Sequence, residues 1–214
     1  MAETIENLVS DLTGLEWELF QRVHNEGGQA YCQTQRDTFF IMRTSQLKTW
    51  PFPVLCSYED DLLIALTQGR NLLAEKYAHM MQFTNPQRYG KLKDRLPKVN
   101  EDTMKQIDQL VALNLKWEEL ANDLYPALRK QGRPVSAADD TENVTSVETY
   151  LRGELMTYSS YTIRILLEHT LQAEEGGRNL VLENLKHIVR AYGYESLETA
   201  EEVLMGKGDG IFHG

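Results

Sequence analysis

Gly69-Arg70-Asn71-Leu72 recurs in the second half of the chain as Gly177-Arg178-Asn179-Leu180. The same shift of 108 residues matches Glu75 with Glu183 and His79 with His187. Two further blocks recur in the same order: Leu15–Glu18 as Leu115–Glu118, and Met42–Trp50 as Leu151–Tyr158 with a one-residue gap. Three matched blocks in one order indicate an internal duplication.

Apolar spacing of three and four residues predicts helices throughout. The first stripe runs over residues 5–23, and further helices are expected over about 37–49 and about 58–82, the last with Gly69 inside it. Pro51-Phe52-Pro53 predicts a turn between them, because proline lacks a backbone donor and restricts the residue before it. No stretch alternates for long enough to predict a strand, so the fold class is all-α.

The duplication predicts two three-helix halves related by a pseudo-two-fold axis. We expect residues 1–100 and 101–205 to pack as one domain around a shared core, with a linker near 98–102. Residues 132–146 are polar and acidic and predict a loop. The glycine-rich residues 206–214 predict a flexible tail.

Charge and cysteine content narrow the function classes. The net charge is −10, from 22 Lys+Arg against 32 Asp+Glu, and no cluster of four basic residues occurs, which argues against nucleic acid and anionic membrane as partners. The two cysteines, Cys32 and Cys56, form no CxxC motif, so a reducing cytoplasm is the expected compartment. The N-terminus lacks a signal-peptide pattern, and no apolar run is long enough to span a bilayer.

Several motifs together resemble the bacterial family catalogued as domain of unknown function 4125. They include Trp17-Glu18, His24–Gly28, Met42-Arg43, Tyr150–Glu154 and both Gly-Arg-Asn-Leu blocks. The resemblance spans residues 8 to 205 and implies no established activity, so it supplies no catalytic residues.

The two Gly-Arg-Asn-Leu blocks give the sharpest candidate site. Arg70 and Arg178 carry guanidinium forks that suit carboxylate, sulfate or phosphate, with Asn71 and Asn179 beside them. Glu75 and Glu183 follow one turn later as candidate bases. Two copies facing one central cavity would make a binding site, whereas the same residues bonded to one another would only join packed helices.

Two more matched pairs add charge to the predicted interior. Arg43 corresponds to Arg152, and Glu18 corresponds to Glu118, each glutamate following a tryptophan. Buried charges are costly unless they are paired, so these side chains predict either a substrate pocket or a structural network of ion pairs.

The segment after the first helix is where the two halves differ. His24 precedes a double glycine and Cys32, and the second half lacks both residue types at the matching place. His24 is therefore a candidate acid–base group, although a helix cap followed by an inert cysteine would explain the same pattern.

We therefore expect a small-molecule enzyme with a central pocket lined by Arg and Glu. Its substrate would be anionic, and a cofactor-independent lyase or cyclase would suit such a site, through elimination or intramolecular displacement. The expected site holds Glu75, Glu183 and His24 as catalytic groups, with Arg43, Arg70, Asn71, Arg152, Arg178 and Asn179 binding the substrate. No metal or cofactor is expected, and the protein partner would be a second copy or a second subunit.

Two alternatives stay open. The first is a non-catalytic helical module, in which the arginines are paired with glutamates and an apolar patch is exposed. The second is a di-metal carboxylate oxidoreductase, because Glu75/His79 and Glu183/His187 approximate the helical Glu-x-x-His ligand pattern, with one residue too many.

Overall fold

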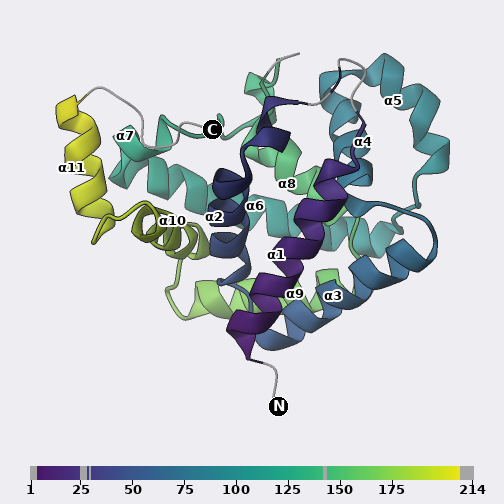
Figure 1. Ribbon diagram of the computed structural model, residues 1–214, viewed down its shortest axis with the longest axis horizontal. Coiled ribbons are helices and arrows are strands. Elements are labelled where there is room, and N and C mark those ends of the chain that lie inside the picture. Colours follow the sequence, from purple (N-terminus) through teal and green to yellow (C-terminus); the bar gives the residue numbers. More distant parts are fainter. Residues whose placement is uncertain (1–3, 25–27, 29, 142–143, 208–214) are drawn as a thin grey trace.

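A computed structural model describes residues 4–24, 28, 30–141 and 144–207. Within these ranges the chain is helical and contains no strand, which confirms the all-α class (Figure 1). The α-helices are α1 (Ile5–Gln21), α2 (Arg36–Leu47), α3 (Phe52–Thr67), α4 (Leu72–Thr84), α5 (Pro86–Leu92), α6 (Glu101–Leu124), α7 (Pro126–Arg129), α8 (Val147–Leu155), α9 (Ser160–Glu175), α10 (Leu180–Ala191) and α11 (Leu197–Lys207). Three short 3₁₀ helices are η1 (Tyr31–Thr34), η2 (Lys93–Arg95) and η3 (Ala137–Asp139).

The helix starts follow from short polar side chains. A side-chain oxygen accepts a backbone N–H of the first turn at the start of α1, α4, α5, α6, α8, α9 and α10, the capping residues being Thr4, Asn71, Asn85, Asn100, Ser146, Ser159 and Asn179. Each such bond satisfies a donor that the helix itself leaves unpaired.

The predicted third helix is wrong at its start and in its middle. The chain forms α3 and α4 instead of one helix over 58–82, because Gly69 adopts a left-handed φ of +69° that ends α3. Arg70 N–H then bonds back to the Ala65 carbonyl, and Asn71 caps α4. The helix also starts earlier than expected, at Phe52, since Pro53 fits the first turn of a helix, where no N–H partner is needed.

The last helix also differs from expectation. α11 continues through Gly206 to Lys207, so the predicted tail over 206–214 begins later than 206. The rest of that predicted tail, residues 208–214, lies outside the described residues.

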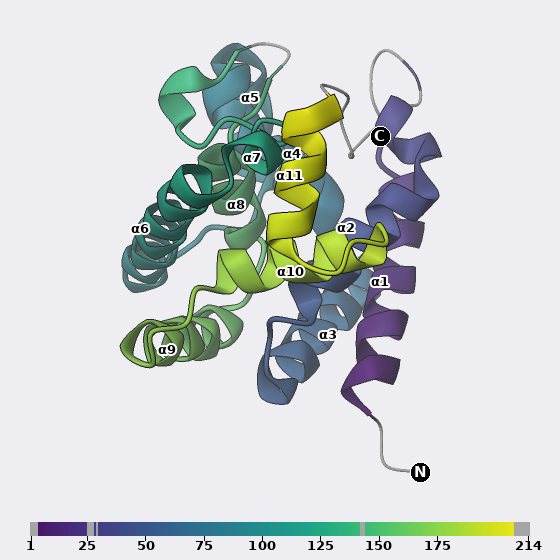
Figure 2. The same cartoon turned by 90° about the vertical axis from the view of Figure 1, so that its left-hand side faces the viewer.

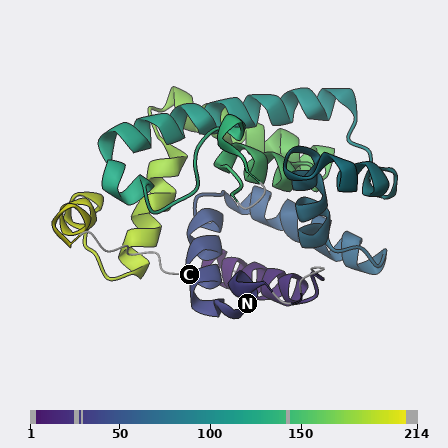
Figure 3. The same cartoon turned by 90° about the horizontal axis from the view of Figure 1, so that it is seen from above.

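The helices pack across the two halves of the sequence. α4 lies against α8, α3 against α9, and α10 against both α2 and α6. Viewed from above, α6 runs along one side of the molecule and α1 lies on the other, with the remaining helices between or beside them (Figure 3). α8 and α4 approach each other closely at Gly153 of α8, where a Cβ would come within 2.8 Å of Met80 Cγ and 3.0 Å of the Lys76 carbonyl oxygen on α4.

The main apolar core draws on both halves. Its buried residues run from Leu8 and Leu12 of α1 to Ile163 and Leu167 of α9. A second, smaller core forms at the C-terminal end from α6, α7, α9, α10 and α11. α11 lies next to α7 and α10, at the left edge of the molecule in Figure 1 and nearest the viewer in Figure 2. Glu201 of α11 is buried there, and its carboxylate accepts the backbone N–H groups of Ala127 and Leu128 at the start of α7.

Among the described residues, no helix combines the length and apolar character needed to cross a bilayer.

Candidate functional site

Four charged side chains meet in the centre of the main core. We call Glu16, Arg43, Lys76 and Glu154 the central ion cluster; they come from α1, α2, α4 and α8, and each is at least nine-tenths buried. Arg43 Nη2 donates to Glu16 Oε1 at 2.6 Å, and Arg43 Nη1 donates to Glu154 Oε1 at 2.7 Å. Four helices thus each supply one charge, and the cluster holds two cations against two carboxylates.

Glu154 is the residue that joins the two cations. Its second oxygen accepts from Lys76 Nζ at 2.5 Å, while its first oxygen also accepts from the Tyr158 hydroxyl at 2.6 Å. Burial opposes ionisation of this carboxyl, but the charges of Arg43 and Lys76 outweigh it and hold its pKa far below the ordinary 4.5. Glu154 is therefore a fixed anion.

Two tyrosines complete the polar contacts. The Tyr58 hydroxyl donates to Glu16, and the rings of Tyr58 and Tyr158 lie 4.9 Å apart between centroids, next to Trp50. Burial raises the pKa of both hydroxyls well above 10, helped by the adjacent carboxylates. Both tyrosines therefore stay protonated and act as hydrogen-bond donors.

A small cavity of about 30 Å³ lies beside the cluster. Glu16, Arg43 and Lys76 form its polar wall, and its apolar wall consists of Phe20, Phe39, Leu73, Tyr77 and Tyr150. A volume of this size holds about one water molecule. The arrangement places two cations and one carboxylate at the end of an aromatic-walled hollow.

The two Gly-Arg-Asn-Leu blocks form matching helix–helix turns. Gly177 repeats the left-handed φ, at +70°, and Arg178 bonds back to the Ala173 carbonyl as Arg70 does to Ala65. Arg70 donates through Nε and Nη2 to Glu75 at 2.8 and 2.7 Å, and Arg178 does the same to Glu183 with the same distances. Hydrogen bonding to the glutamate raises the pKa of both arginines.

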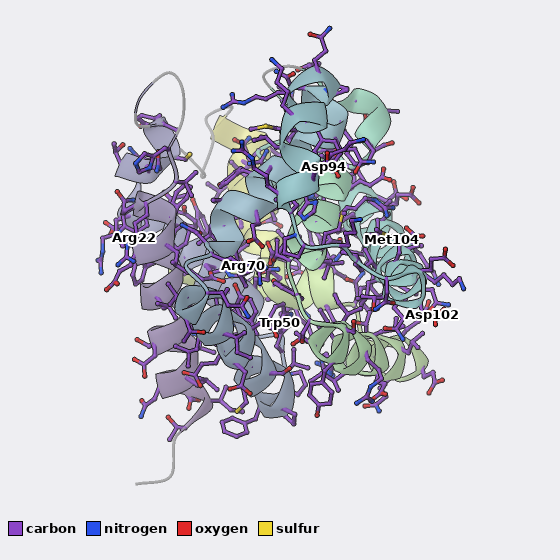
Figure 4. The ribbon with its side chains drawn as sticks, turned by 90° about the vertical axis from the view of Figure 1, so that its right-hand side faces the viewer. Arg22, Trp50, Arg70, Asp94, Asp102 and Met104 are labelled. Carbon is purple, nitrogen blue, oxygen red and sulfur yellow. The ribbon has the colours of Figure 1, made fainter. Side chains whose placement is uncertain are left out.

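These turns do not converge on one cavity. They lie on opposite sides of the molecule in Figure 1, and Arg70 faces the viewer when the α3–α4 side is seen in Figure 4. Asn71 and Asn179 cap α4 and α10, and their amide groups donate to the carbonyls of Leu19 and Trp117. The two turns therefore do not form the central pocket that the sequence predicts. The guanidinium group of each arginine is instead paired with the glutamate of its own turn.

Among the other candidates, only Arg43 belongs to the central ion cluster. Arg152 points away from it and pairs with Asp108 at 2.5 Å, and Glu18 is exposed beside Arg22. His24 is exposed and bonds to the Arg22 carbonyl, so it lies away from the cluster on the chain segment that follows α1. Glu118 is buried against Arg129, in the smaller core.

The ligand pattern of the di-metal alternative is not assembled in the described part of the chain. No group of three or more His, Cys, Asp or Glu side chains is placed to hold a metal there. Glu75 is engaged by Arg70, and His79 is buried with neither ring nitrogen hydrogen-bonded to a described residue. Burial lowers the pKa of His79, so this ring is neutral at pH 7.

Sequence reasoning missed four residues of this site and its surroundings besides Glu16: Lys76, Glu154, Tyr58 and Tyr158. A signal for Glu16 was present, because it stands four residues after Leu12 and three before Leu19, on the face that α1 buries. Lys76 stands four residues after Leu72 and four before Met80, on the buried face of α4. A charged residue on an apolar helix face needs a buried partner, and that requirement marks both positions.

The fold and site define the class: an all-helical protein whose core is built around a buried cluster of two cations and two carboxylates. The family model described as "Protein of unknown function (DUF4125)" matches residues 6–202. The chain belongs to this family, as its motifs indicate. No curated protein and no solved structure matches it.

Proposed function

We propose that this chain is an enzyme of small-molecule metabolism whose active centre is the central ion cluster with its cavity. The observation that carries the proposal is the burial of Glu16, Arg43 and Lys76 at one wall of an aromatic-lined hollow. Ionisable groups are expensive to bury even when paired, and sites where their pKa values are strongly displaced are often functional. A core that needed only stability would place apolar side chains there.

The substrate proposed is a compact anion. Arg43 and Lys76 both reach the cavity wall, and a guanidinium beside an ammonium suits a carboxylate, sulfate or phosphate group. Because the cavity holds about one water molecule, its aromatic wall of Phe20, Phe39, Tyr77 and Tyr150 would have to move apart to admit such a group. Arg70 and Arg178 have no place in this site, because each is paired at its own surface turn.

The roles within the cluster follow from its hydrogen bonds. Glu154 holds Arg43 and Lys76 in position, and the protonated Tyr158 orients that carboxylate. Glu16 is the carboxylate that faces the cavity, so it would accept a proton from the substrate, while Arg43 and Lys76 stabilise negative charge as it develops on the leaving group. Elimination or intramolecular displacement needs these two functions and no cofactor.

The internal duplication belongs to the same proposal. The matching turns at Gly69 and Gly177 support it, and so do crossed contacts, since α4 packs on α8 as α10 packs on α2. Gln46 and Glu154 sit at matched positions, and both accept from Arg43 Nη1. Arg43 would then lie near the pseudo-two-fold axis. A cytoplasmic location and a second copy or second subunit as partner stay predictions.

One observation favours the non-catalytic helical module instead. Each of the four arginines singled out from the sequence has a carboxylate partner, the pairing that a purely structural role predicts: Arg43 with Glu16 and Glu154, Arg70 with Glu75, Arg152 with Asp108, and Arg178 with Glu183. The two functions differ in whether the cavity binds a small anion.

Native mass spectrometry of the purified protein, followed by thermal unfolding with sulfate, phosphate and acetate at constant ionic strength, tests the proposal. A ligand at about 100 times its Kd stabilises the folded state by about 2.7 kcal/mol. We expect one of these anions to do so, and Lys76→Met to abolish the effect. Lys116→Met, which removes an exposed ion pair with Glu174, is the matched control. No retained anion and no stabilisation by any of the three would favour the helical module.

A further inference from the structure

An anionic group in the cavity beside the central ion cluster would lie next to a carboxylate. Glu16 lines this cavity together with Arg43 and Lys76, and the volume of about 30 Å³ has room for about one water molecule. An anion that approaches the two cations there also approaches the Glu16 carboxylate. Two negative groups placed side by side in a buried site do not both stay ionised, because each disfavours the charged form of the other.

The charges of the cluster are already balanced. Two cations face two carboxylates, and all four side chains are at least nine-tenths buried. An added anion would leave one negative charge uncompensated in the core, which is costly. One proton taken up with the anion would restore the balance.

Few donors of the cluster are available to an anion. The five N–H groups of Arg43 already have acceptors, which are both oxygens of Glu16, Gln46, Glu154 and the Tyr158 hydroxyl. Lys76 Nζ has three N–H groups and donates one hydrogen bond, to Glu154, while the Tyr150 ring centroid lies 3.5 Å away. Lys76 therefore keeps a donor for a ligand, and a protonated Glu16 would supply a second one.

Glu16 is the carboxylate of the cluster that can take up this proton. Helices α2, α3 and α4 pack against α1, and α8 completes the cluster. The charged and titratable groups that these elements bring to Glu16 and its cavity are Arg43, Tyr58, Lys76, Tyr77, Tyr150, Glu154 and, directly after α8, Tyr158. Glu154 bonds to two cations, which hold its pKa far below 4.5, whereas Glu16 bonds to Arg43 alone. Glu16 Oε2 accepts one hydrogen bond and Oε1 accepts two, so Oε2 has the place for a proton.

We propose that an anion enters this cavity together with one proton, which Glu16 Oε2 takes up from solvent and then shares with the anion as a hydrogen-bond donor. The inference rests on the proposed function and adds to it the protonation state of the occupied site. In the proposed reaction this complex follows proton transfer to Glu16, with the leaving group held by Lys76 and by the protonated carboxyl group. A simple anion is then an analogue of the product.

Isothermal titration calorimetry with formate and with acetate tests this coupling, because both anions stay ionised at neutral pH. Titrations in two buffers of different ionisation enthalpy count the protons taken up with each anion. We expect about one proton per anion bound, and an affinity that rises about tenfold for each unit by which the pH falls between about 8 and 6. Binding without proton uptake and with a constant Kd would overturn the inference and leave the proposed function standing. If neither anion bound at any pH, the inference would be wrong, and the sulfate and phosphate measurements would decide the proposed function separately.

Tyr58→Phe tests the assignment to Glu16 without removing a charge. The Tyr58 hydroxyl donates to Glu16 Oε1, so its loss makes the ionised carboxylate less favourable, and formate should bind at least about threefold more tightly at neutral pH. Tyr158→Phe is the matched control, because the Tyr158 hydroxyl donates to Glu154, which does not line the cavity. Equal effects of the two substitutions, or weaker binding in Tyr58→Phe, would overturn the assignment of the proton to Glu16.

Discussion

At the residue scale, Glu154 has the largest energetic role that the structure defines. Its carboxylate contacts both Arg43 and Lys76 in the buried core, and Glu16 supplies the second negative charge. Removing one member of a buried ion pair leaves an uncompensated charge, and that cost exceeds any gain from the pair itself. The four residues therefore depend on one another for folding as well as for any chemistry.

Glu154→Gln should lower the free energy of unfolding by about 3 kcal/mol, the low end for breaking a buried pair, because the amide keeps the shape but not the charge. Urea denaturation followed by circular dichroism measures it. Glu168→Gln, which removes an exposed i,i+4 partner of Arg164, should change stability by less than about 0.5 kcal/mol. Equal small effects of the two substitutions would contradict the role given to Glu154.

The same carboxylate should make stability depend on pH. The pKa of Glu154 is lowered in the folded state, so between that value and 4.5 the unfolded chain binds more protons. Its contribution is complete above pH 4.5 and is lost progressively as the pH falls below it. Glu154→Gln should therefore flatten the decline of stability between about pH 4.5 and 3. An unaltered pH profile would show that Glu154 is not ionised in the folded protein.

At the element scale, glycines decide where helices end and how closely they pack. Gly69 has a left-handed backbone, and a Cβ added there would meet no neighbouring atom within 4 Å. The cost of a side chain at this position is thus purely conformational. Gly14 lies inside α1 with equally open surroundings. A side chain meets no packing obstacle at either position, so a comparison of the two measures the effect of backbone conformation alone.

Gly69→Ala should destabilise the protein by about 1 kcal/mol, because alanine adopts the left-handed region at a cost. Gly14→Ala should stabilise it by up to about 1 kcal/mol, since alanine favours a helix interior. Thermal unfolding of both variants would check the opposite signs. If both substitutions changed the stability in the same direction, the left-handed conformation of Gly69 in the turn between α3 and α4 would be contradicted.

Gly153→Ala tests the contact between α4 and α8. The new methyl group would press on Met80 Cγ and on the Lys76 carbonyl, and overpacking of this kind costs about 1–3 kcal/mol. The helix carrying Glu154 would shift away from the helix carrying Lys76. We expect a lower midpoint in urea. An unchanged midpoint would mean that α8 relaxes freely at this point.

The sequence predicts the helical class, but it merges α3 with α4 and predicts no turn at Gly69. The apolar pattern continues through Gly69, and only the left-handed conformation of that residue separates the two helices. The site is harder to predict, because Glu16 meets Arg43 and Glu154 only after three helices pack. Pairing between residues far apart in the chain depends on tertiary geometry, which local periodicity does not contain.

At the scale of the whole molecule, the two halves share one core. Ile107 of α6 and Ile163 of α9 are buried in the same cluster as Leu8 and Leu55. A fragment of residues 1–100 would expose this apolar surface and would leave Arg43 without Glu154. Residues 1–100 therefore lack the interior of an independent domain.

Residues 1–100 expressed alone should show little helix by circular dichroism, and addition of residues 101–214 should restore much of the helical signal, because each half supplies the surface that the other buries. The full chain is the reference. A stable, cooperatively unfolding 1–100 fragment would contradict the shared core.

The contact of Glu201 with the start of α7 links the last helix to a distant part of the surface. α7 spans only Pro126–Arg129, and a helix of that length is not stable without support. Its first N–H groups are held by a carboxylate supplied more than 70 residues later, and Arg129 and Lys130 follow directly. A proteolytic nick ahead of α11 would thus loosen one rim of the surface hollow of about 470 Å³ that Arg129 and Lys130 line, while leaving the ion pairs of the main core in place.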